Sequence, residues 1–316
     1  VVALTRMGAG LAMGFSNVYG AIIPRSFLRP FLFLCITVLG VMQLSPLPAH
    51  WIMIGFIIAN MAVFGVQIIV LLRPLRKLEI DAYGQPLSFV QWRTWLEFGG
   101  IVGSAVIFIE FFQHISILIA SYTLSMAEIG YLDISLKLVG FITFGIVAVN
   151  QTYLPRNAHA FLSVETAKLQ GLLRQAAFIR CLASALGICI VYSVGPSILI
   201  LFGSEFSAAI PVLNVLIWVP FLIAFFGPAA NMLSITDQPV VLLKIVMATL
   251  FSLCIGVVWG GQVWGLMGVA YAVLFSWITW EGLTAMITWQ RLGVDTTFIS
   301  LFIQHTQHSK PQGHIT

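Results

Sequence analysis

Charged residues are scarce in this sequence. Only 8% of the 316 residues are Asp, Glu, Lys or Arg, whereas 59% are hydrophobic. A typical soluble domain carries roughly 25% charged residues. A water-soluble globule with so few charges cannot cover its surface, and apolar runs of about 20 residues, the length that crosses a hydrocarbon layer, recur along the chain. The composition therefore excludes most soluble folds and predicts an all-α, polytopic membrane helical bundle.

Motifs that carry catalysis, nucleotide binding or metal binding are also missing. The sequence has no Walker loop, no GxSxG and no HExxH motif. Its four cysteines lie inside apolar runs without CxxC spacing, which is typical of small buried hydrophobic side chains. His305 and His308 stand three residues apart in a polar segment, which is only half of a metal site. We therefore expect no enzyme, no metal site and no cofactor.

The apolar runs divide the chain into about eight spans. They are predicted at 27–44, 51–72, 98–123, 134–154, 181–202, 210–235, 242–260 and 264–289. The segment 73–97 is the most polar of the interior and contains Pro74, Gly84 and Pro86, so it is predicted to link two parts, 27–72 and 98–289. Residues 1–26 are predicted to lie at the cytoplasmic face, and 290–316 to form a polar, unanchored cytoplasmic tail. The segment 155–180 is predicted either as a helix lying at the interface or as an ordinary solvated connector.

The placement of Lys and Arg predicts the orientation. Numbering the membrane faces alternately puts the basic residues of the N-terminus, 73–93, 155–180, Lys244 and the tail on one side. The opposite loops, 45–50, 124–133, 203–209 and 260–263, contain no Lys or Arg. Because positive residues resist translocation, both ends are expected to be cytoplasmic. The basic loops are expected to meet anionic lipid headgroups and not nucleic acid.

Glu110 lies near the middle of a predicted span. An ionised carboxylate there costs about 2.5 to 3.5 kcal/mol, so it faces a cavity or is protonated. His114 is one turn away on the same helix face, with Gln113 beside it. Two interpretations stay open: a neutral carboxyl group hydrogen-bonded inside the bundle, or a cavity residue that contacts a polar substrate or carries a proton.

Two further ionisable residues lie within predicted spans. Lys137 is close to the outer end of its span and is expected to snorkel to the surface or to pair with Asp133 one turn earlier. Glu281 lies at a depth close to that of Glu110, so the two carboxyl groups are candidates to share one cavity. Packing between helices is the alternative for Glu281.

Polar residues and helix breakers interrupt the C-terminal spans. Asn150 and Asn231 are further cavity candidates, because polar side chains in lipid are tolerated where they are buried in protein or line water. The breakers are Pro196, Pro211, Pro220 and Pro228. This pattern suits a transporter better than a simple anchor.

An ordered set of short motifs runs through nearly the whole chain: Pro24–Pro30, Glu128–Tyr131, Ala148–Arg156, Leu201–Phe206, Ala209–Leu213, Gly227-Pro228, Asn231–Leu233 and Thr236-Asp237. Together they resemble the O-antigen and lipid-linked oligosaccharide flippases of the multidrug/oligosaccharidyl-lipid/polysaccharide exporter superfamily. The resemblance implies two six-helix lobes around a central cavity that opens alternately to each membrane face. It places 27–72 as the last two helices of the first lobe and 98–289 as a complete second lobe, with the first four helices lacking.

The resemblance also implies a substrate and a location. The substrate class is an undecaprenyl-pyrophosphate-linked oligosaccharide, flipped across the bacterial inner membrane for O-antigen or exopolysaccharide synthesis. Membrane lipids, a polysaccharide polymerase and glycosyltransferases are the expected partners. Arginine matches phosphate bidentately, so basic residues near the inner face are candidates for capturing the pyrophosphate. These are Arg25, Arg29, Arg73, Arg76 and Arg93.

Two other functions remain open, and a third is disfavoured. A cation-coupled drug exporter of the same superfamily shares the fold and uses membrane acids such as Glu110 or Glu281 for coupling. A non-transporting remnant or assembly partner is compatible with the lacking helices. A membrane glycan polymerase or glycosyltransferase is expected to carry a large outer loop with Arg or Asp, and the predicted outer loops are short and lack basic residues.

Overall fold

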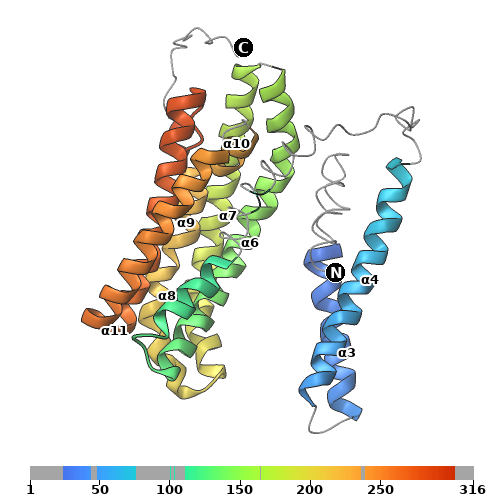
Figure 1. Ribbon diagram of the computed structural model, residues 1–316, viewed down its shortest axis with the longest axis vertical. Helices are drawn as coiled ribbons and strands as arrows, with labels where there is room; N and C mark the ends of the chain where they lie inside the picture. Colours follow the sequence, from blue (N-terminus) through green and yellow to red (C-terminus); the bar gives the residue numbers. More distant parts are fainter. Residues whose placement is uncertain are drawn as a thin grey trace. The chain divides into compact units, whose positions relative to one another are not determined.

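The computed structural model describes residues 24–43, 48–75, 100, 103, 111–163, 165–235 and 239–302. Every described element is a helix (Figure 1). The chain divides into two compact units, Val1–Leu87 and Ser88–Thr316, and the boundary between them falls within the predicted linker 73–97. Each unit is described by itself.

The first unit holds a helical hairpin. A short π-helical turn, η1 (Pro24–Leu28), leads into α3 (Arg29–Gln43), and α4 (Ala49–Leu75) follows. The rings of Phe33 and Phe56 meet edge to face with centroids 5.8 Å apart. At Gly55 the two helices approach so closely that a Cβ would lie 2.8 Å from Ile36 Cγ2, so the absent side chain permits the packing.

The second unit contains the remaining helices. A short helix Phe111–Ala120 comes first. The others are α6 (Met126–Leu162), α7 (Thr166–Leu201), η2 (Ser204–Ala209), α8 (Ile210–Leu216), α9 (Trp218–Phe226), α10 (Ala229–Ile235), α11 (Pro239–Leu292) and η3 (Phe298–Leu301). The predicted span 210–235 is therefore broken into three pieces, and the second break is at Gly227, whose φ of 84° ends α9.

Helices α6 and α7 form a long antiparallel hairpin and pack side by side (Figure 1). A capping box starts α6: the Ser125 hydroxyl accepts from the Glu128 N–H, and the Glu128 carboxylate accepts from the Ser125 N–H. The helix then continues through Pro155 to Leu162, and α7 begins only four residues later. The expectation of an interfacial helix or a loose connector at 155–180 is therefore wrong, because this segment consists of the ends of two long helices and the tight turn between them.

A second hairpin lies within α11. Gly265 has φ 57° and ψ −139°, which interrupts the helix and divides it into two arms. A Cβ on Gly260 would lie 2.7 Å from the Gly268 carbonyl oxygen, and one on Gly256 would lie 3.0 Å from Ala272 Cβ. Contacts between residues placed symmetrically about Gly265 show that the arms run antiparallel. The small residues let the two backbones touch, as in the small-xxx-small packing of membrane helices.

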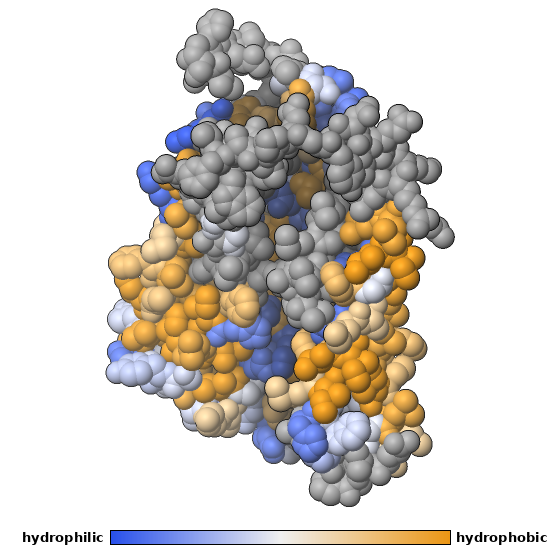
Figure 2. All heavy atoms as spheres, turned by 45° about the vertical axis from the view of Figure 1, so that its right-hand side comes forward, coloured by the Kyte–Doolittle hydropathy of each residue, from blue (hydrophilic) through white to orange (hydrophobic). Residues whose placement is uncertain are grey.

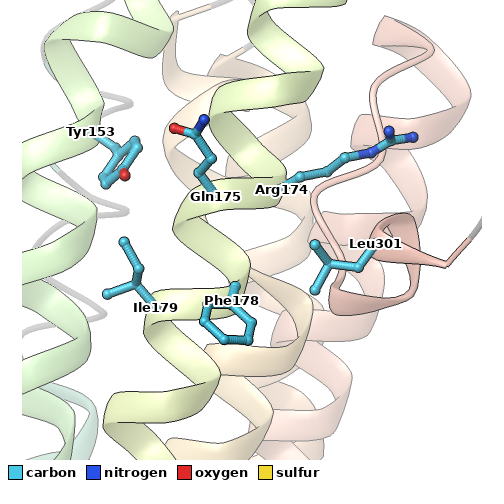
Figure 3. Close-up of a pocket in the computed structure, with 6 residues that line it drawn as sticks. All are labelled: Tyr153, Arg174, Gln175, Phe178, Ile179 and Leu301. Carbon is cyan, nitrogen blue, oxygen red and sulfur yellow. The ribbon is translucent and has the colours of Figure 1, made fainter.

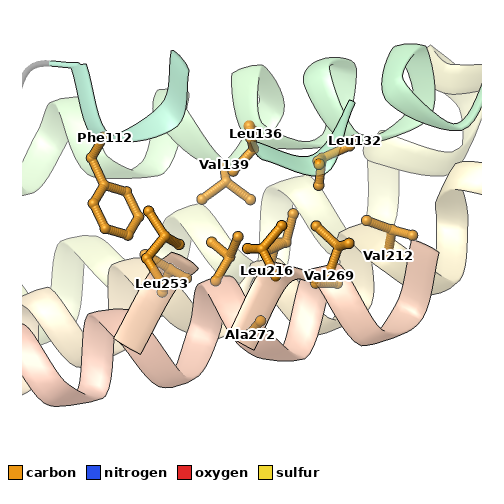
Figure 4. Close-up of a cluster of buried hydrophobic side chains, with 14 of the residues drawn as sticks. Phe112, Leu132, Leu136, Val139, Val212, Leu216, Leu253, Val269 and Ala272 are labelled. Carbon is orange, nitrogen blue, oxygen red and sulfur yellow. The ribbon is translucent and has the colours of Figure 1, made fainter. Parts of the chain in front are cut away.

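The interior and the exterior of the second unit are both apolar. Side chains from α6, α8, α11 and the helix Phe111–Ala120 form one continuous buried cluster that includes Phe112, Leu136, Leu216 and Leu253 (Figure 4). Large hydrophobic side chains also cover the outside, among them Phe141 at 75% exposed and Phe251 at 69%. Figure 2 shows hydrophobic residues, in orange, over much of the face that it draws. So much exposed apolar surface is incompatible with water and is matched by hydrocarbon.

Five described helices are long and apolar enough to cross a membrane: His50–Leu72, Met126–Leu162, Thr166–Leu201, Ser204–Phe226 and Val240–Leu292. The shorter helices Arg29–Met42 and Phe111–Ala120 are also apolar. The chain is thus an all-α membrane protein, as predicted. The count of eight spans and the two-lobe arrangement stay predictions.

The two hairpins gather the basic residues at one end of the second unit. The α6–α7 turn, the start of α11 and its end all lie there, because Gln170 on α7 bonds Asp295, and Thr288 on α11 bonds Ala229. We call this the basic end; its cations are Arg156, Lys168, Arg174, Lys244 and Arg291. The turns at the opposite end, 121–125, 202–209 and 264–265, contain no Lys or Arg.

Candidate functional site

Arg180 is fully buried in the interior of the helical bundle, at 0% exposed. It occupies the inward face of α7, in line with Leu173, Ala177 and Ser184, which are also buried. This spacing of three and four residues is that of one helix face, so the amphipathic pattern that buries the leucines also carries the arginine inside. A buried charge must be compensated by its neighbours, which makes its surroundings the place to look for function.

Two polar residues from other helices lie near Arg180. Its Nη1 donates a hydrogen bond to Asn150 Oδ1 on α6 at 3.2 Å. Glu281, on the second arm of α11, is only 6% exposed and lies within electrostatic range of the guanidinium, but the two side chains form no direct ion pair. We call Arg180, Asn150 and Glu281 the Arg180 cluster.

The guanidinium of Arg180 is incompletely satisfied. Its Nε and Nη2 are buried without a hydrogen-bond partner among the described residues, and so is the hydroxyl of Ser184 one turn further along α7. An unmade hydrogen bond on a buried donor costs about 1 to 3 kcal/mol, and more on a charged group. The cluster therefore retains donors that an oxyanion or water can satisfy.

Gly227 leaves room for the arginine. A Cβ at this position would lie 2.7 Å from Arg180 Nη2 and 2.2 Å from the Thr296 carbonyl oxygen. Its positive φ is also one that side chains disfavour. The break between α9 and α10 thus makes space for both the guanidinium and the chain that follows α11.

Residues 293–302 are packed against the bundle and do not form an unanchored tail. The Gln170 side chain donates to the Asp295 carbonyl at 2.8 Å and accepts from its N–H at 3.2 Å. The Thr296 hydroxyl donates to the Phe226 carbonyl at 2.9 Å. The prediction of an unanchored tail from residue 290 is wrong for this part, because the Thr296 hydroxyl satisfies the Phe226 carbonyl at the end of α9 and the Gln170 side chain holds the backbone of Asp295. His305 and His308 lie outside the described residues.

A polar stripe extends from Glu281 toward the basic end. Thr284 and Thr288 follow it on the same buried face of α11, and both hydroxyls bond carbonyls of their own helix. Thr288 also donates to the Ala229 carbonyl at 3.3 Å. Hydroxyl groups satisfied in this way are compatible with lipid surroundings.

The structure brings together two of the predicted cavity residues, Glu281 and Asn150, in the Arg180 cluster. Asn231 is half-buried on α10. Gln113 is half-buried and His114 exposed on the helix Phe111–Ala120, where the His114 ring lies 5.9 Å from that of Phe111. Glu110 lies outside the described residues, so the shared cavity of Glu110 and Glu281 stays a prediction.

The predicted capture arginines are only partly described. Arg29 is half-buried at the start of α3. The backbones of Arg25 and Arg73 belong to η1 and α4, but their side chains lie outside the description, as do Arg76 and Arg93 entirely. The pairing predicted for Lys137 is confirmed: its Nζ lies 2.6 Å from Asp133 Oδ2.

Arg180 ends the segment 155–180, which was predicted either as an interfacial helix or as a solvated connector, so its role in the interior was missed. The signal that identifies it is helical phase: Leu169, Leu173 and Ala177 precede it at intervals of three or four residues, on a face that stays apolar. The span predicted from hydropathy begins only at Cys181, so it leaves Arg180 out, and mean hydropathy does not reveal the helical phase.

The described residues hold no group of three or more His, Cys, Asp or Glu side chains arranged to bind a metal ion. Comparison of the chain with protein-family models, curated proteins and solved structures gives no match. The fold and the cluster define its class: an all-α membrane protein with buried charges inside its helical bundle.

Proposed function

We propose that this chain is a membrane transporter that flips an undecaprenyl-pyrophosphate-linked oligosaccharide across the bacterial inner membrane by alternating access. The short motifs that resemble those of polysaccharide exporters are what supports the substrate class. The observation that carries the transport function is the Arg180 cluster. Ionisable side chains inside a membrane bundle are costly and most often mark a substrate or ion pathway, whereas an apolar anchor has no need of them.

The chemistry of the cluster suits an anionic headgroup. A guanidinium binds phosphate bidentately, and Arg180 keeps Nε and Nη2 without a partner among the described residues. In the proposed cycle, Arg180 is balanced by Glu281 while the bundle is closed, and it exchanges this interaction for the pyrophosphate when the helices separate. Arg25, Arg29, Arg73, Arg76 and Arg93 remain the proposed sites of first capture.

The test is complementation of surface glycan in a strain that lacks the native gene. Arg180→Gln is expected to lower glycan display by about tenfold or more at equal protein levels in the membrane, because one charged hydrogen bond contributes about 1.5 to 3 kcal/mol. Arg180→Lys, which keeps the charge, should retain part of the activity. Lys137→Gln is the matched control, since this cation pairs with Asp133 at the surface. Wild-type display by Arg180→Gln would refute the role of the cluster.

A cation-coupled drug exporter is the second candidate, and the buried carboxyl group of Glu281 favours it. Membrane acids carry coupling protons or cations in such transporters. Drug susceptibility in a host deprived of its own exporters separates the two functions. Under the second proposal, Glu281→Gln abolishes resistance and glycan display never depends on the chain.

A further inference from the structure

A cavity of about 450 Å³ opens at the basic end, between α6, α7 and η3. Figure 3 shows that its lining comes from three segments that are distant in sequence. Tyr153 projects from α6 and Leu301 from η3, while α7 contributes Arg174, Gln175, Phe178 and Ile179. Arg180 does not line it, so this cavity is separate from the Arg180 cluster.

The walls of the cavity are mostly apolar, but its rim is cationic. Tyr153, Phe178, Ile179 and Leu301 supply aromatic and aliphatic surface, and Arg174 supplies a guanidinium. A second guanidinium is near, because that of Arg156 lies over the Tyr153 ring, 5.9 Å from its centroid. A free, fully hydrated anion gains little from apolar walls, whereas an amphipathic ligand uses both parts.

The cavity lies where the surface of α7 changes from polar to apolar. Before it, Glu165, Thr166 and Lys168 are exposed; from Phe178 onward, large hydrophobic side chains are prominent among the exposed ones. These are Phe178, Ile179, Leu182, Leu186 and Ile190. Such a transition marks the boundary between lipid headgroups and hydrocarbon, where arginine side chains meet phosphates.

We propose that this cavity binds a phospholipid with an anionic headgroup, taken from the surrounding bilayer. The headgroup phosphate pairs with Arg174 and Arg156, and an acyl chain follows Phe178 and Ile179 toward the hydrocarbon. Bridging α6, α7 and η3, the lipid fastens the C-terminal segment to the bundle. The inference depends on the chain being embedded in a membrane and not on what it transports.

The experiment uses the full chain in nanodiscs of phosphatidylcholine, with or without phosphatidylglycerol. Thermal unfolding and native mass spectrometry report stabilisation and retained lipid. Phosphatidylglycerol is expected to raise the unfolding midpoint and to remain bound. Arg174→Ala should weaken its binding about fivefold, since one basic residue near the surface contributes about 1 kcal/mol, and Arg174→Lys should restore most of it. Lys168→Ala removes a cation from the same helix outside the cavity and should change nothing.

A second variant tests the same cavity if Arg174→Ala does not fold. Phe178 is 58% exposed, so Phe178→Ala leaves the core intact and should also weaken retention. Leu186→Ala, equally exposed at 57% two turns away, is its control. Equal retention by Phe178→Ala and Leu186→Ala would overturn the proposal. An unfolding midpoint that does not respond to phosphatidylglycerol would also overturn it. So would inorganic phosphate in detergent raising the unfolding midpoint as much as phosphatidylglycerol does, because the ligand would then be a soluble anion.

Discussion

At the scale of one residue, the burial of the Arg180 guanidinium is energetically costly. Replacing buried ion pairs by apolar side chains is often neutral or stabilising, so such pairs are weak evidence for stability. Asn150 satisfies one donor, and the interaction with Glu281 is not a direct ion pair within the described residues. Because burial of this charge brings little stability, its presence in the bundle points to a role in function.

Gly227 provides a test of how tightly this site is packed. Gly227→Ala should lower the free energy of unfolding by about 1 to 3 kcal/mol, because its Cβ would collide with the Thr296 carbonyl and its φ of 84° disfavours a side chain. Denaturant titration in detergent measures the change. Gly282→Ala is the control, since a Cβ there meets nothing within 4 Å. Equal stability of the two variants would mean that the segment after α11 is loosely held.

Single residues were predictable where the sequence isolates them. Glu281 and Asn150 stand out because they interrupt apolar runs, and Lys137 and Asp133 because they are spaced by one turn. Arg180 follows four other charged residues of the segment 155–180, Arg156, Glu165, Lys168 and Arg174, and only the packing of α6 against α7 distinguishes it from them.

At the scale of elements, hydropathy located the helices but not their ends. The window at 134–154 matches the apolar part of α6, whereas the helix itself runs from Met126 to Leu162. Hydropathy reports which residues lie in the hydrocarbon layer. The ends of a helix are determined by its capping residues and turns, which can lie outside that layer. One predicted helix breaker was misleading: Pro196 lies inside α7 without ending it, whereas Gly227 ends α9.

The α11 hairpin depends on backbone contact between its arms. Gly268→Ala places a Cβ 1.9 Å from the Gly260 carbonyl oxygen, so the arms must separate, and we expect a loss of about 1 to 3 kcal/mol in stability. Thermal unfolding in detergent checks this. Gly140→Ala, at a position inside α6 where a Cβ would meet nothing within 4 Å, should leave stability unchanged or raise it by up to about 1 kcal/mol. Unchanged stability of Gly268→Ala would rule out the backbone contact between the two arms of α11.

For the whole molecule, composition predicted the class correctly because it reflects the solvent. With 59% hydrophobic residues the outside must be apolar too, and it is. The arrangement of lobes and the identity of the substrate depend on the resemblance to polysaccharide exporters, and they stay predictions. Neither follows from hydropathy, because hydropathy contains no information on which helices pack against each other.

The topology makes a prediction about accessibility. The turns at 121–125 and 163–165 are separated by α6, whose 37 residues span about 55 Å against a hydrocarbon layer of about 30 Å. With Cys35, Cys181, Cys189 and Cys254 replaced by serine or alanine, single cysteines at Ser125 and Ser163 should react with an impermeant maleimide from opposite sides of the membrane. Reaction of both from one side in intact cells would exclude α6 as a span.

The length of the α6–α7 hairpin has a practical use. Residues 155–162 add about two helical turns beyond the apolar part of α6, and α7 runs beside them from Thr166. A rigid partner protein spliced into the turn at Ser163 would continue both helices without a flexible joint. It would give electron cryomicroscopy of this small particle the asymmetric landmark needed to align its images.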